Sequence, residues 1–321
     1  MTRIEAPSRL HFGLLSLPIV GDELWPDGSS RRQFGGVGLM IDNPRIALTV
    51  ARTDEWSSDA ERALAFARTF SASLPLEEQR PFRIDVERCP EEHTGLGSGT
   101  ALALAVAKAI AIESGHADWP AVELARRVGR GERSAIGVHG FDLGGLIVEA
   151  GKLPGVGETI SPLIDRYEFP PEWRIILIQP RVDARWHGPR ERRAFAHLKR
   201  NNPTEALCRL VLTGLLPALA AKDLDTFGEA LHEYNARAGE AFAAEQGGVY
   251  AGPEVADVVA LLRKDGIRGA GQSSWGSTVF AVVEDEEQAK GISHLLADKA
   301  HTTKGASAGH SWQTSASNEL R

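Results

Sequence analysis

A glycine-rich run, Thr94–Thr100, stands directly before the alanine- and leucine-rich run Ala101–Ile112. Alanine and leucine lose little side-chain entropy in a helix, so the glycines are expected at a helix N-terminus. Free N–H groups and the helix dipole favour an anion there, and glycine lets the backbone approach it closely. The predicted phosphate-binding residues are Gly95, Gly97, Ser98, Gly99 and Thr100. An ordinary loop capped by Ser98 or Thr100 is the alternative that this run alone leaves open.

Six glycines are interspersed with charged residues in a second stretch, Gly129–Gly145. Arginine makes bidentate contacts with phosphate, which makes Arg130 and Arg133 candidates for binding an anion. His139 is a candidate acid or base near neutral pH, and Asp142 is a candidate ligand for a divalent cation. A surface turn with solvated charges is the alternative.

Two other parts of the chain carry basic residues in patterns that suit an anionic ligand. Arg9 and His11 stand two residues apart in an expected strand, so their side chains face the same side. A bound phosphate or carboxylate would explain the pair, although an edge strand with one solvated face explains it more simply. In the basic run Arg181–Arg200, Arg185–Gly188 is a candidate for substrate contact, and the remaining charges are typical of a solvated helix.

A second run of glycines and hydroxyl groups, Gly269–Thr278, lies between two expected strands. Its backbone is expected to face the first glycine run across a cleft. Polar contacts to a ligand are then predicted for Gln272, Ser273 and Ser274, with Trp275 as a wall. A tight hairpin with Trp275 in the core is the alternative.

Composition narrows the class of protein. Among 321 residues, 36 are Lys or Arg and 43 are Asp or Glu, so the net charge of −7 makes nucleic acid an unexpected partner. Cys89 and Cys208 are far apart and show no metal-ligand spacing, which indicates a reducing compartment without a disulfide framework. No signal peptide and no bilayer-spanning run is recognised, so we expect a cytoplasmic protein without a membrane partner.

Strands and helices alternate irregularly in both halves, which predicts an α+β fold with two subdomains. The predicted boundaries are 1–160 for the part with the phosphate loop, 161–300 for the second part, and 301–321 for a polar, partly disordered tail. The early strands are expected to be interrupted at Pro7 and at Asn43–Pro44.

Taken together, these motifs resemble the GHMP kinase superfamily over nearly the whole chain. Ala6–Leu10 is similar to its first motif, Gly95–Gly99 to its phosphate loop, and Gly269–Gln272 to its C-terminal glycine motif. The resemblance implies a ribosomal-protein-like N-terminal domain, a ferredoxin-like C-terminal domain and a site between them.

Two departures from the kinase pattern concern the chemistry. The kinases commonly carry a second serine where this chain has Gly99, and many carry Ser-Gly-Ile-Asp, with a catalytic aspartate, where it has Ser134–Gly137. A glycine has no proton acceptor in its side chain, which argues against ordinary phosphoryl transfer to an alcohol.

One branch of the superfamily, the β-ribofuranosylaminobenzene 5′-phosphate synthases, is similar in this altered pattern. The matching runs are Arg9–Gly13, Gly36–Leu39, His93–Thr100, Gly129–Gly145 and Gly271–Gly276. This resemblance implies condensation of phosphoribosyl pyrophosphate with 4-aminobenzoate or 4-hydroxybenzoate, with loss of pyrophosphate and carbon dioxide, in tetrahydromethanopterin biosynthesis. It also implies Mg²⁺ and a homodimer.

The implied chemistry assigns a role to each candidate group. The catalytic residues would be Arg133, His139 and Asp142, with Asp142 also assisting the metal. Substrate or phosphate would be bound by Arg9, His11, Gly95, Gly97, Ser98, Gly99, Thr100, Arg130, Gln272, Ser273 and Ser274. An ATP-dependent small-molecule kinase and a non-catalytic phosphate- or nucleotide-binding regulator are the alternatives.

Overall fold

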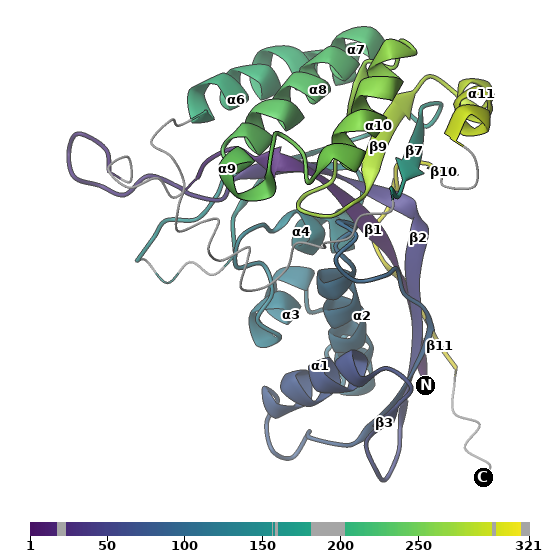
Figure 1. Cartoon of the computed structure of the whole chain (residues 1–321). Coiled ribbons are helices and arrows are strands. Elements are labelled where there is room, and N and C mark those ends of the chain that lie inside the picture. The colour runs from purple at the N-terminus through teal and green to yellow at the C-terminus, as the bar shows by residue number, and fades with distance from the viewer. Residues whose placement is uncertain (18–23, 156, 158–159, 181–202, 297–299, 316–321) are drawn as a thin grey trace.

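The computed structural model describes residues 1–17, 24–155, 157, 160–180, 203–296 and 300–315, which form two sheet-and-helix bodies (Figure 1). The expected contact at Arg185–Gly188 and the helix expected in the same basic run lie outside the described residues. Strands and helices occur in both bodies, which confirms the predicted α+β class.

The first body contains a seven-stranded sheet, in which β3 and β4 pair in parallel and every other described pair is antiparallel. Its strands are β1 (Thr2–Leu14), β2 (Gly36–Arg52), β3 (Ser57–Ser58), β4 (Phe82–Arg88), β5 (Leu146–Glu149), β6 (Leu163–Tyr167) and β11 (Ser311–Thr314). Its helices are α1 (Glu61–Ala72), α2 (Ser98–Glu113), α3 (Ala121–Arg127) and α4 (Ile136–Leu143).

The second body contains a four-stranded antiparallel sheet in the order β10-β7-β9-β8. Its strands are β7 (Arg174–Ile178), β8 (Gly269–Gln272), β9 (Val279–Val283) and β10 (Ala300–Thr303). Its helical segments are α6 (Thr204–Leu210), η1 (Val211–Leu215), α7 (Leu216–Ala221), α8 (Leu224–Glu240), α9 (Ala243–Gln246), α10 (Pro253–Lys264) and α11 (Glu286–Leu296).

Helix α2 fills the centre of the first body. Every residue from Ala101 to Ala111 is buried, and small alanines let α1, β1 and β2 pack closely around it. A helix that is apolar on all sides is expected in such a position. The burial of α2 therefore fixes where its N-terminus, and the glycine loop before it, lies relative to the sheet.

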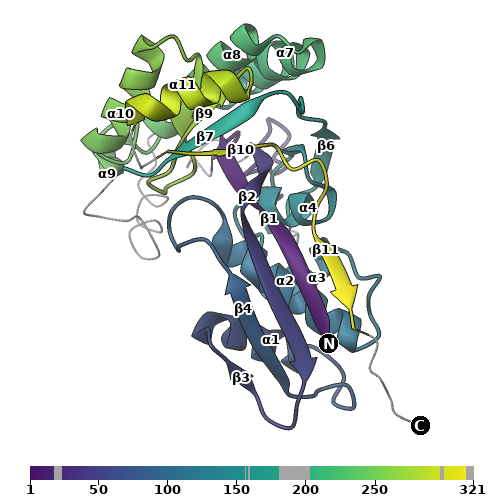
Figure 2. The same ribbon diagram turned by 90° about the vertical axis from the view of Figure 1, so that its right-hand side faces the viewer.

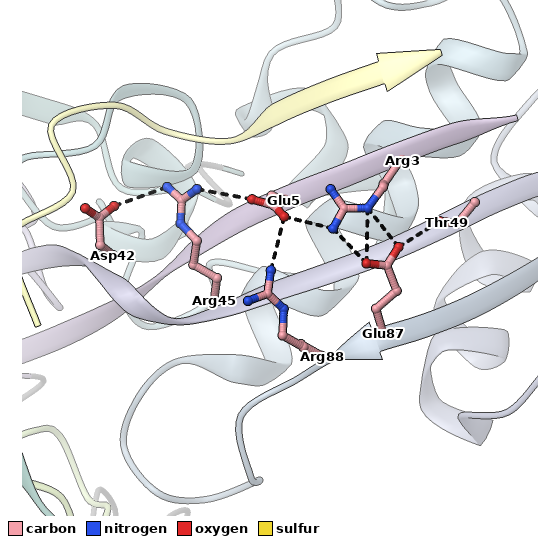
Figure 3. Close-up of polar contacts among 7 residues, drawn as sticks. All are labelled: Arg3, Glu5, Asp42, Arg45, Thr49, Glu87 and Arg88. Carbon is pink, nitrogen blue, oxygen red and sulfur yellow. Dashed lines mark hydrogen bonds and ion pairs between the residues drawn. The ribbon is translucent and has the colours of Figure 1, made fainter. Parts of the chain in front are cut away.

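The other face of this sheet carries charged side chains, which alternate with core residues along β1. Ile4 and Ala6 point inward, whereas Arg3 and Glu5 point outward. Arg3 bonds the Glu87 carboxylate at 2.7 Å and Glu5 at 2.8 Å, and Figure 3 shows this network extending across the strands. These bonds to Arg3 lower the pKa of Glu5 and of Glu87.

One hydrophobic core crosses from the first body to the second. It joins Leu10 and Phe12 of β1 to Phe227 and Leu231 of α8 and to Phe280 of β9. The rings of Phe12 and Phe280 are 5.1 Å apart. Figures 1 and 2 show β1 and β2 running from one body into the other, so the two bodies share strands and core as well as a surface.

The structure corrects the predicted boundaries. Strand β6 pairs with β5, so the first sheet extends past residue 160 to Tyr167. The segment expected to be a disordered tail forms β10 in the second sheet and β11 beside β1 in the first, as Figure 2 shows. All side chains of β11 are exposed, so backbone pairing with β1 holds this strand in place. Its polar sequence therefore gave no indication that it would be ordered.

The two early strands are also longer than predicted. β1 continues past Pro7 and β2 continues past Pro44, and the pairing between them shifts register at this point. The Ser8 hydroxyl donates to the carbonyl of Pro44 at 2.6 Å. The prolines therefore mark an irregularity within a continuous ladder.

Within the described residues, the helical segment Thr204–Ala221 is long and apolar enough to cross a membrane by length and composition, although none was recognised in the sequence. Its buried face includes Leu207, Val211, Leu215 and Leu219, which pack in the core shared by the two bodies. A core helix satisfies the same criteria.

The segment between β10 and β11, residues 304–310, should contribute strongly to the stability of the folded protein. Lys304 and Ala306 exchange backbone hydrogen bonds with Asp42, Met40 and Gly145 at 2.6–2.9 Å. A chain ending at Thr303 lacks Lys304 and Ala306, so the backbone groups of Asp42, Met40 and Gly145 lose their hydrogen-bond partners. Each of these groups that is buried then costs about 1–3 kcal/mol of stability. We expect its free energy of unfolding, measured in urea, to fall by at least about 3 kcal/mol.

A chain ending at His310 is the control, because it keeps these bonds and loses residues 311–321, which include the exposed strand β11. Its loss should be clearly smaller. Equal losses in the two truncated chains would show that the 304–310 segment contributes nothing of its own.

Candidate active site

A pocket of about 450 Å³ opens where the N-terminus of α2 meets the second body. Four of its walls come from distant parts of the chain: β1, the glycine loop before α2, the loop before α4, and the α8–α9 region with the β8–β9 turn. This volume lies within the ordinary range for small-molecule sites. The pocket brings together the predicted residues Arg9, His11, Gly95, Gly97, Ser98, Gly99, Thr100, Arg130, Arg133, Gln272 and Ser274.

The first glycine loop has the conformation that an anion site requires. Gly95 and Gly97 have φ of 94° and 72°, which favour glycine, and α2 begins at Ser98. A Cβ on Gly95 would lie 2.2 Å from the Ser273 carbonyl oxygen, and one on Gly97 would lie 2.7 Å from Cγ of Arg9. The loop can therefore lie this close to Ser273 and Arg9 only because side chains are absent at these two positions. The first residues of α2, Ser98–Thr100, line the pocket, and free N–H groups at a helix start favour an anion.

The second glycine loop contacts the first directly, with no cleft between them. The Ser273 hydroxyl donates to the Gly95 carbonyl at 2.8 Å and accepts from the N–H of His11 at 3.0 Å. Thr278 N–H donates to the Thr94 carbonyl at 3.1 Å. Ser273 is fully buried and is not among the residues that line the pocket, and its hydroxyl joins three chain segments.

Gln272 and Ser274 lie at the rim of this junction. The Gln272 side chain accepts from Ala251 N–H at 2.8 Å and donates to the Ser274 carbonyl at 2.9 Å, so it braces the pocket wall. Trp275 lines the pocket and meets the ring of Phe242 edge-on, with centroids 4.2 Å apart. The predicted wall is therefore present, and Phe242 is a partner that the sequence did not suggest.

Four guanidinium groups line the pocket, from Arg9, Arg62, Arg130 and Arg133. Arg9 donates to the Gly95 carbonyl at 3.1 Å, and Arg130 lies 4.7 Å from the ring centre of Phe66. Burial and the charge of Arg62 lower the pKa of Arg130, although arginine stays charged in proteins. Like charges brought together in this way favour a multiply anionic ligand.

Arg62 was missed because it stands in the first turn of an amphipathic helix, where a charge is ordinarily solvated. Its guanidinium forms an ion pair with Glu92, which also lines the pocket. No local motif in the sequence connects α1 to the glycine loop, so only the packing of α1 against α2 reveals the contact.

His139 and Asp142, the predicted catalytic and metal-binding residues, are not among the residues that line the pocket. They stand three apart on α4 and share a face of that helix. His139 Nε2 lies 2.7 Å from the Ser161 carbonyl oxygen, and Asp142 accepts from Ala121 N–H at 2.7 Å, at the start of α3. Asp142 thus caps the start of α3.

Gly137 lies beside two residues that line the pocket. A Cβ on Gly137 would lie 3.6 Å from Thr100 Cγ2 and 3.7 Å from Arg9 Cγ.

His11 and Glu149 lie beneath the pocket in a buried polar cluster. Glu149, at the end of β5, is fully buried and accepts from the Ser134 hydroxyl and from Ala135 N–H, each at 2.7 Å. Burial raises the pKa of Glu149 to about 7 and lowers that of His11 to about 3. His11 is therefore neutral near pH 7 and offers a hydrogen bond where the sequence suggested an anion-binding charge.

Sequence reasoning passed over Glu149 because it ends the apolar run Leu146–Glu149 and belongs to no motif. Its one sequence signal is a lone carboxylate in an otherwise apolar strand. Such a residue is almost never fully buried unless it has partners.

Another part of the pocket lining is apolar and aromatic. Phe242, Trp275 and Tyr250 contribute rings, and Ala238 and Val249 fill the space between them. A flat aromatic ring would find dispersion contacts here that a sugar phosphate would not. The pocket therefore has an anion-binding half and an aromatic half.

Oxygen atoms suited to a divalent cation are few. Among the described residues, no three His, Cys, Asp or Glu side chains gather closely enough to hold a metal ion. Mg²⁺, however, usually binds one or two carboxylates together with water and substrate phosphates. Glu92 and the Ser98 hydroxyl line the pocket and fit that limited role.

Comparison with known proteins supports the kinship that the motifs indicate. Residues 61–145 match the GHMP kinases N terminal domain, and residues 215–300 match the GHMP kinases C terminal domain. The solved structures with similar folds include a mevalonate pyrophosphate decarboxylase from Streptococcus pyogenes, at TM-score 0.68 and 11% identity, covering 96% of this chain and 97% of that one. Another is a homoserine kinase from Cytophaga hutchinsonii, at TM-score 0.64 and 16% identity, covering 97% of each chain. At these identities the likeness establishes the fold alone.

Two curated relatives match at higher identity. The β-ribofuranosylphenol 5′-phosphate synthase of Methanothermobacter thermautotrophicus is 32% identical over 308 residues, covering 88% of this chain and 89% of the relative. The protein of the same name from Archaeoglobus fulgidus is 31% identical, covering 93% of this chain and 92% of the relative. The chain therefore belongs to the β-ribofuranosylphenol 5′-phosphate synthase family, a group of pentosyltransferase-type enzymes within the GHMP kinase superfamily.

Proposed function

We propose that this enzyme condenses phosphoribosyl pyrophosphate with 4-hydroxybenzoate or 4-aminobenzoate, releasing pyrophosphate and carbon dioxide and forming a C-riboside 5′-phosphate for tetrahydromethanopterin biosynthesis. The observation that carries the proposal is the division of one pocket into an anion-binding half and an aromatic half. The first half suits a diphosphate and the second suits a benzoate ring. The name of the relatives, which refers to a ribosylated phenol carrying a 5′-phosphate, supports a ribosyl phosphate donor and a phenolic acceptor.

The anion-binding half would hold the diphosphate. The first turn of α2 supplies N–H groups and the positive end of its dipole, and Ser98 and Thr100 add hydroxyls. Arg9, Arg130 and Arg133 would neutralise the diphosphate, the 5′-phosphate or the benzoate carboxylate. Stabilising the negative charge of the departing diphosphate is the main contribution that such a site can make to catalysis.

Bond breaking at the anomeric carbon leaves an oxocarbenium-like centre. The ring carbon that bears the carboxylate attacks this centre, and loss of carbon dioxide restores the aromatic ring. No sugar hydroxyl has to be deprotonated for this transfer. The absence of a side chain at Gly137, which faces Thr100 and Arg9, is therefore compatible with the reaction.

Mg²⁺ would fit this site in combination with the substrate. Bound there, it would neutralise charge on the leaving pyrophosphate. Glu92 and the Ser98 hydroxyl are the protein groups that would help to hold it, in place of the more distant Asp142. The remaining ligands would be substrate oxygens and water.

The proposed reaction predicts a specific release of carbon dioxide. Purified protein incubated with phosphoribosyl pyrophosphate, Mg²⁺ and carboxyl-labelled 4-hydroxybenzoate or 4-aminobenzoate should release labelled carbon dioxide only when phosphoribosyl pyrophosphate is present. The faster acid would identify the preferred acceptor. If folded protein releases none from either acid, while it forms ADP from ATP with a small alcohol, the kinase alternative replaces this proposal.

Arg133 provides a test of the anion-binding half. Replacing it with alanine removes a charged donor worth about 1.5–3 kcal/mol. The Arg133→Ala variant should therefore lose roughly tenfold to a hundredfold in kcat/KM, measured with phosphoribosyl pyrophosphate or benzoate as the varied substrate.

Arg126→Ala is the matched control, because Arg126 lies on the nearby helix α3 and its side chain is exposed outside the pocket. It should keep the parental kinetics. Equal behaviour of the two variants would exclude Arg133 from the site.

A further inference from the structure

A buried carboxylate remains unused by the transfer as described. Glu149 lies directly beneath Ser134, a residue that lines the pocket. The Ser134 hydroxyl donates its hydrogen to Glu149 Oε1 at 2.7 Å, so its two lone pairs can accept hydrogen bonds. One lone pair accepts from Ile136 N–H at 3.3 Å, and the other remains for a ligand in the pocket. This arrangement can receive a proton from a bound hydroxyl group and pass another one inward.

His11 lies close to the same carboxylate of Glu149. A Cβ at Gly36 would lie 3.4 Å from both His11 Nε2 and Glu149 Oε1, so these two atoms face the space that the glycine leaves open. His11 lines the pocket and is 5% exposed, and its Nε2 is buried without a hydrogen-bond partner among the described residues. A buried polar atom without a partner costs free energy unless a ligand or water completes it.

The other proton acceptors of the pocket are less suitable. Glu92 is engaged with the guanidinium of Arg62, and Glu132 is exposed to solvent. His93 also lines the pocket, but its side chain is 43% exposed and its Nε2 lies 3.7 Å from the Glu92 carboxylate. The side chains of Gln272 and Asn235 are occupied by backbone hydrogen bonds. The Ser134–Glu149 pair thus combines a pocket-facing oxygen with a titratable group shielded from water.

We infer that Ser134 and Glu149 form a proton relay for the phenolic hydroxyl of a hydroxybenzoate acceptor, with His11 as a further hydrogen-bond partner of that hydroxyl. This inference rests on the proposed function. Ser134 contacts the substrate, whereas Glu149 acts through Ser134 and is a positioning residue. A proton relay favours a phenol as the acceptor. An aromatic amine can donate its lone pair to the ring without first losing a proton.

The proposed step balances in atoms and electrons. The phenolic O–H bond breaks and its proton passes to Ser134 Oγ, while the Ser134 proton moves to Glu149. The phenolate electrons enter the ring, whose carboxylate-bearing carbon bonds the anomeric carbon as the bond to diphosphate breaks. Carbon dioxide then leaves, its bonding electrons restore the aromatic phenolate, and the relay returns the proton to it. The relay ends as it began and consumes no co-reactant.

The surroundings of Glu149 set the pH at which the relay works. Arg9 from β1 favours the ionised carboxylate, and neutral His11 adds no charge. Tyr234 from α8 also interacts with Glu149; the pKa of Tyr234 is raised well above normal, and its hydroxyl donates to the Gly13 carbonyl at 2.9 Å. Burial outweighs the hydrogen bonds from Ser134, Ala135 and Ser161, so the pKa of Glu149 is about 7.

A base must be deprotonated to accept a proton, which fixes the sign of the pH effect. With 4-hydroxybenzoate, kcat/KM should fall as pH decreases below about 7, where Glu149 becomes protonated. The Glu149→Gln variant should lose this limb of the profile. A variant that retains the limb would assign it to another group and overturn the relay.

The decisive experiment compares acceptors whose hydroxyl groups ionise with different ease. The Ser134→Ala and Glu149→Gln variants should lose about 100-fold in kcat/KM with 4-hydroxybenzoate. Their loss relative to the parent enzyme should be several-fold smaller with a 4-hydroxybenzoate carrying two ring fluorines, because its hydroxyl is more acidic. With 4-aminobenzoate, where the parent enzyme accepts it, the loss should be smallest.

Ser8→Ala is the matched control, since Ser8 is a fully buried serine of the same sheet whose hydroxyl donates to the Pro44 carbonyl and does not line the pocket. Its effect should be the same for every acceptor. In a double-mutant cycle, the effects of Ser134→Ala and Glu149→Gln should be strongly non-additive, because either one interrupts the relay. Ser134→Ala removes only one oxygen, so it remains informative if Glu149→Gln does not fold.

The outcomes separate the two proposals. Equal losses of the Ser134 and Glu149 variants with all acceptors would overturn the relay and leave the proposed function intact. A parent enzyme that turns over none of the acids would overturn the proposed function itself, and the relay with it.

Discussion

The site depends on a single buried hydroxyl group at the junction of three chain segments. Ser273 Oγ accepts from His11 N–H and donates to the Gly95 carbonyl, so β1, the first glycine loop and the β8–β9 turn meet at one atom. Around it, Asn235 donates to the carbonyls of Phe12 and Gln272, which adds α8 to the junction. Because both bodies contribute to this network, the anion-binding half and the aromatic half of the pocket are held in a fixed relation.

The glycines of this junction are required by close packing as much as by ligand access. A Cβ on Gly276 would lie 2.1 Å from the backbone nitrogen of Gly95, so the two glycine loops can touch only where side chains are absent. Gly13 similarly allows β1 to approach Ala238 of α8. The motifs that resemble a ligand-binding signature therefore also contain the residues that let the two bodies come together.

The local features were predictable, and the long-range ones were not. Alanine-rich periodicity and clustered glycines identified α2 and the glycine loop at its N-terminus, because both depend on neighbours in sequence. The side chain of Asp142 bonds the start of α3, a contact that its own motif does not reveal, and the strand at 311–314 was missed because backbone pairing alone orders it. Arg62, Phe242 and Glu149 enter the site only through tertiary packing, on which neither residue type nor spacing gives information.

The proposed reaction makes a carbon–carbon bond on a kinase-like scaffold. The most direct measurement is the NMR spectrum of the product formed from phosphoribosyl pyrophosphate labelled with ¹³C at the anomeric carbon and a benzoate labelled at the ring carbon that bears the carboxylate. The proposed reaction predicts a one-bond coupling between the two labelled carbons. Attachment of the ribosyl group through oxygen or nitrogen, with the carboxylate retained, would contradict it.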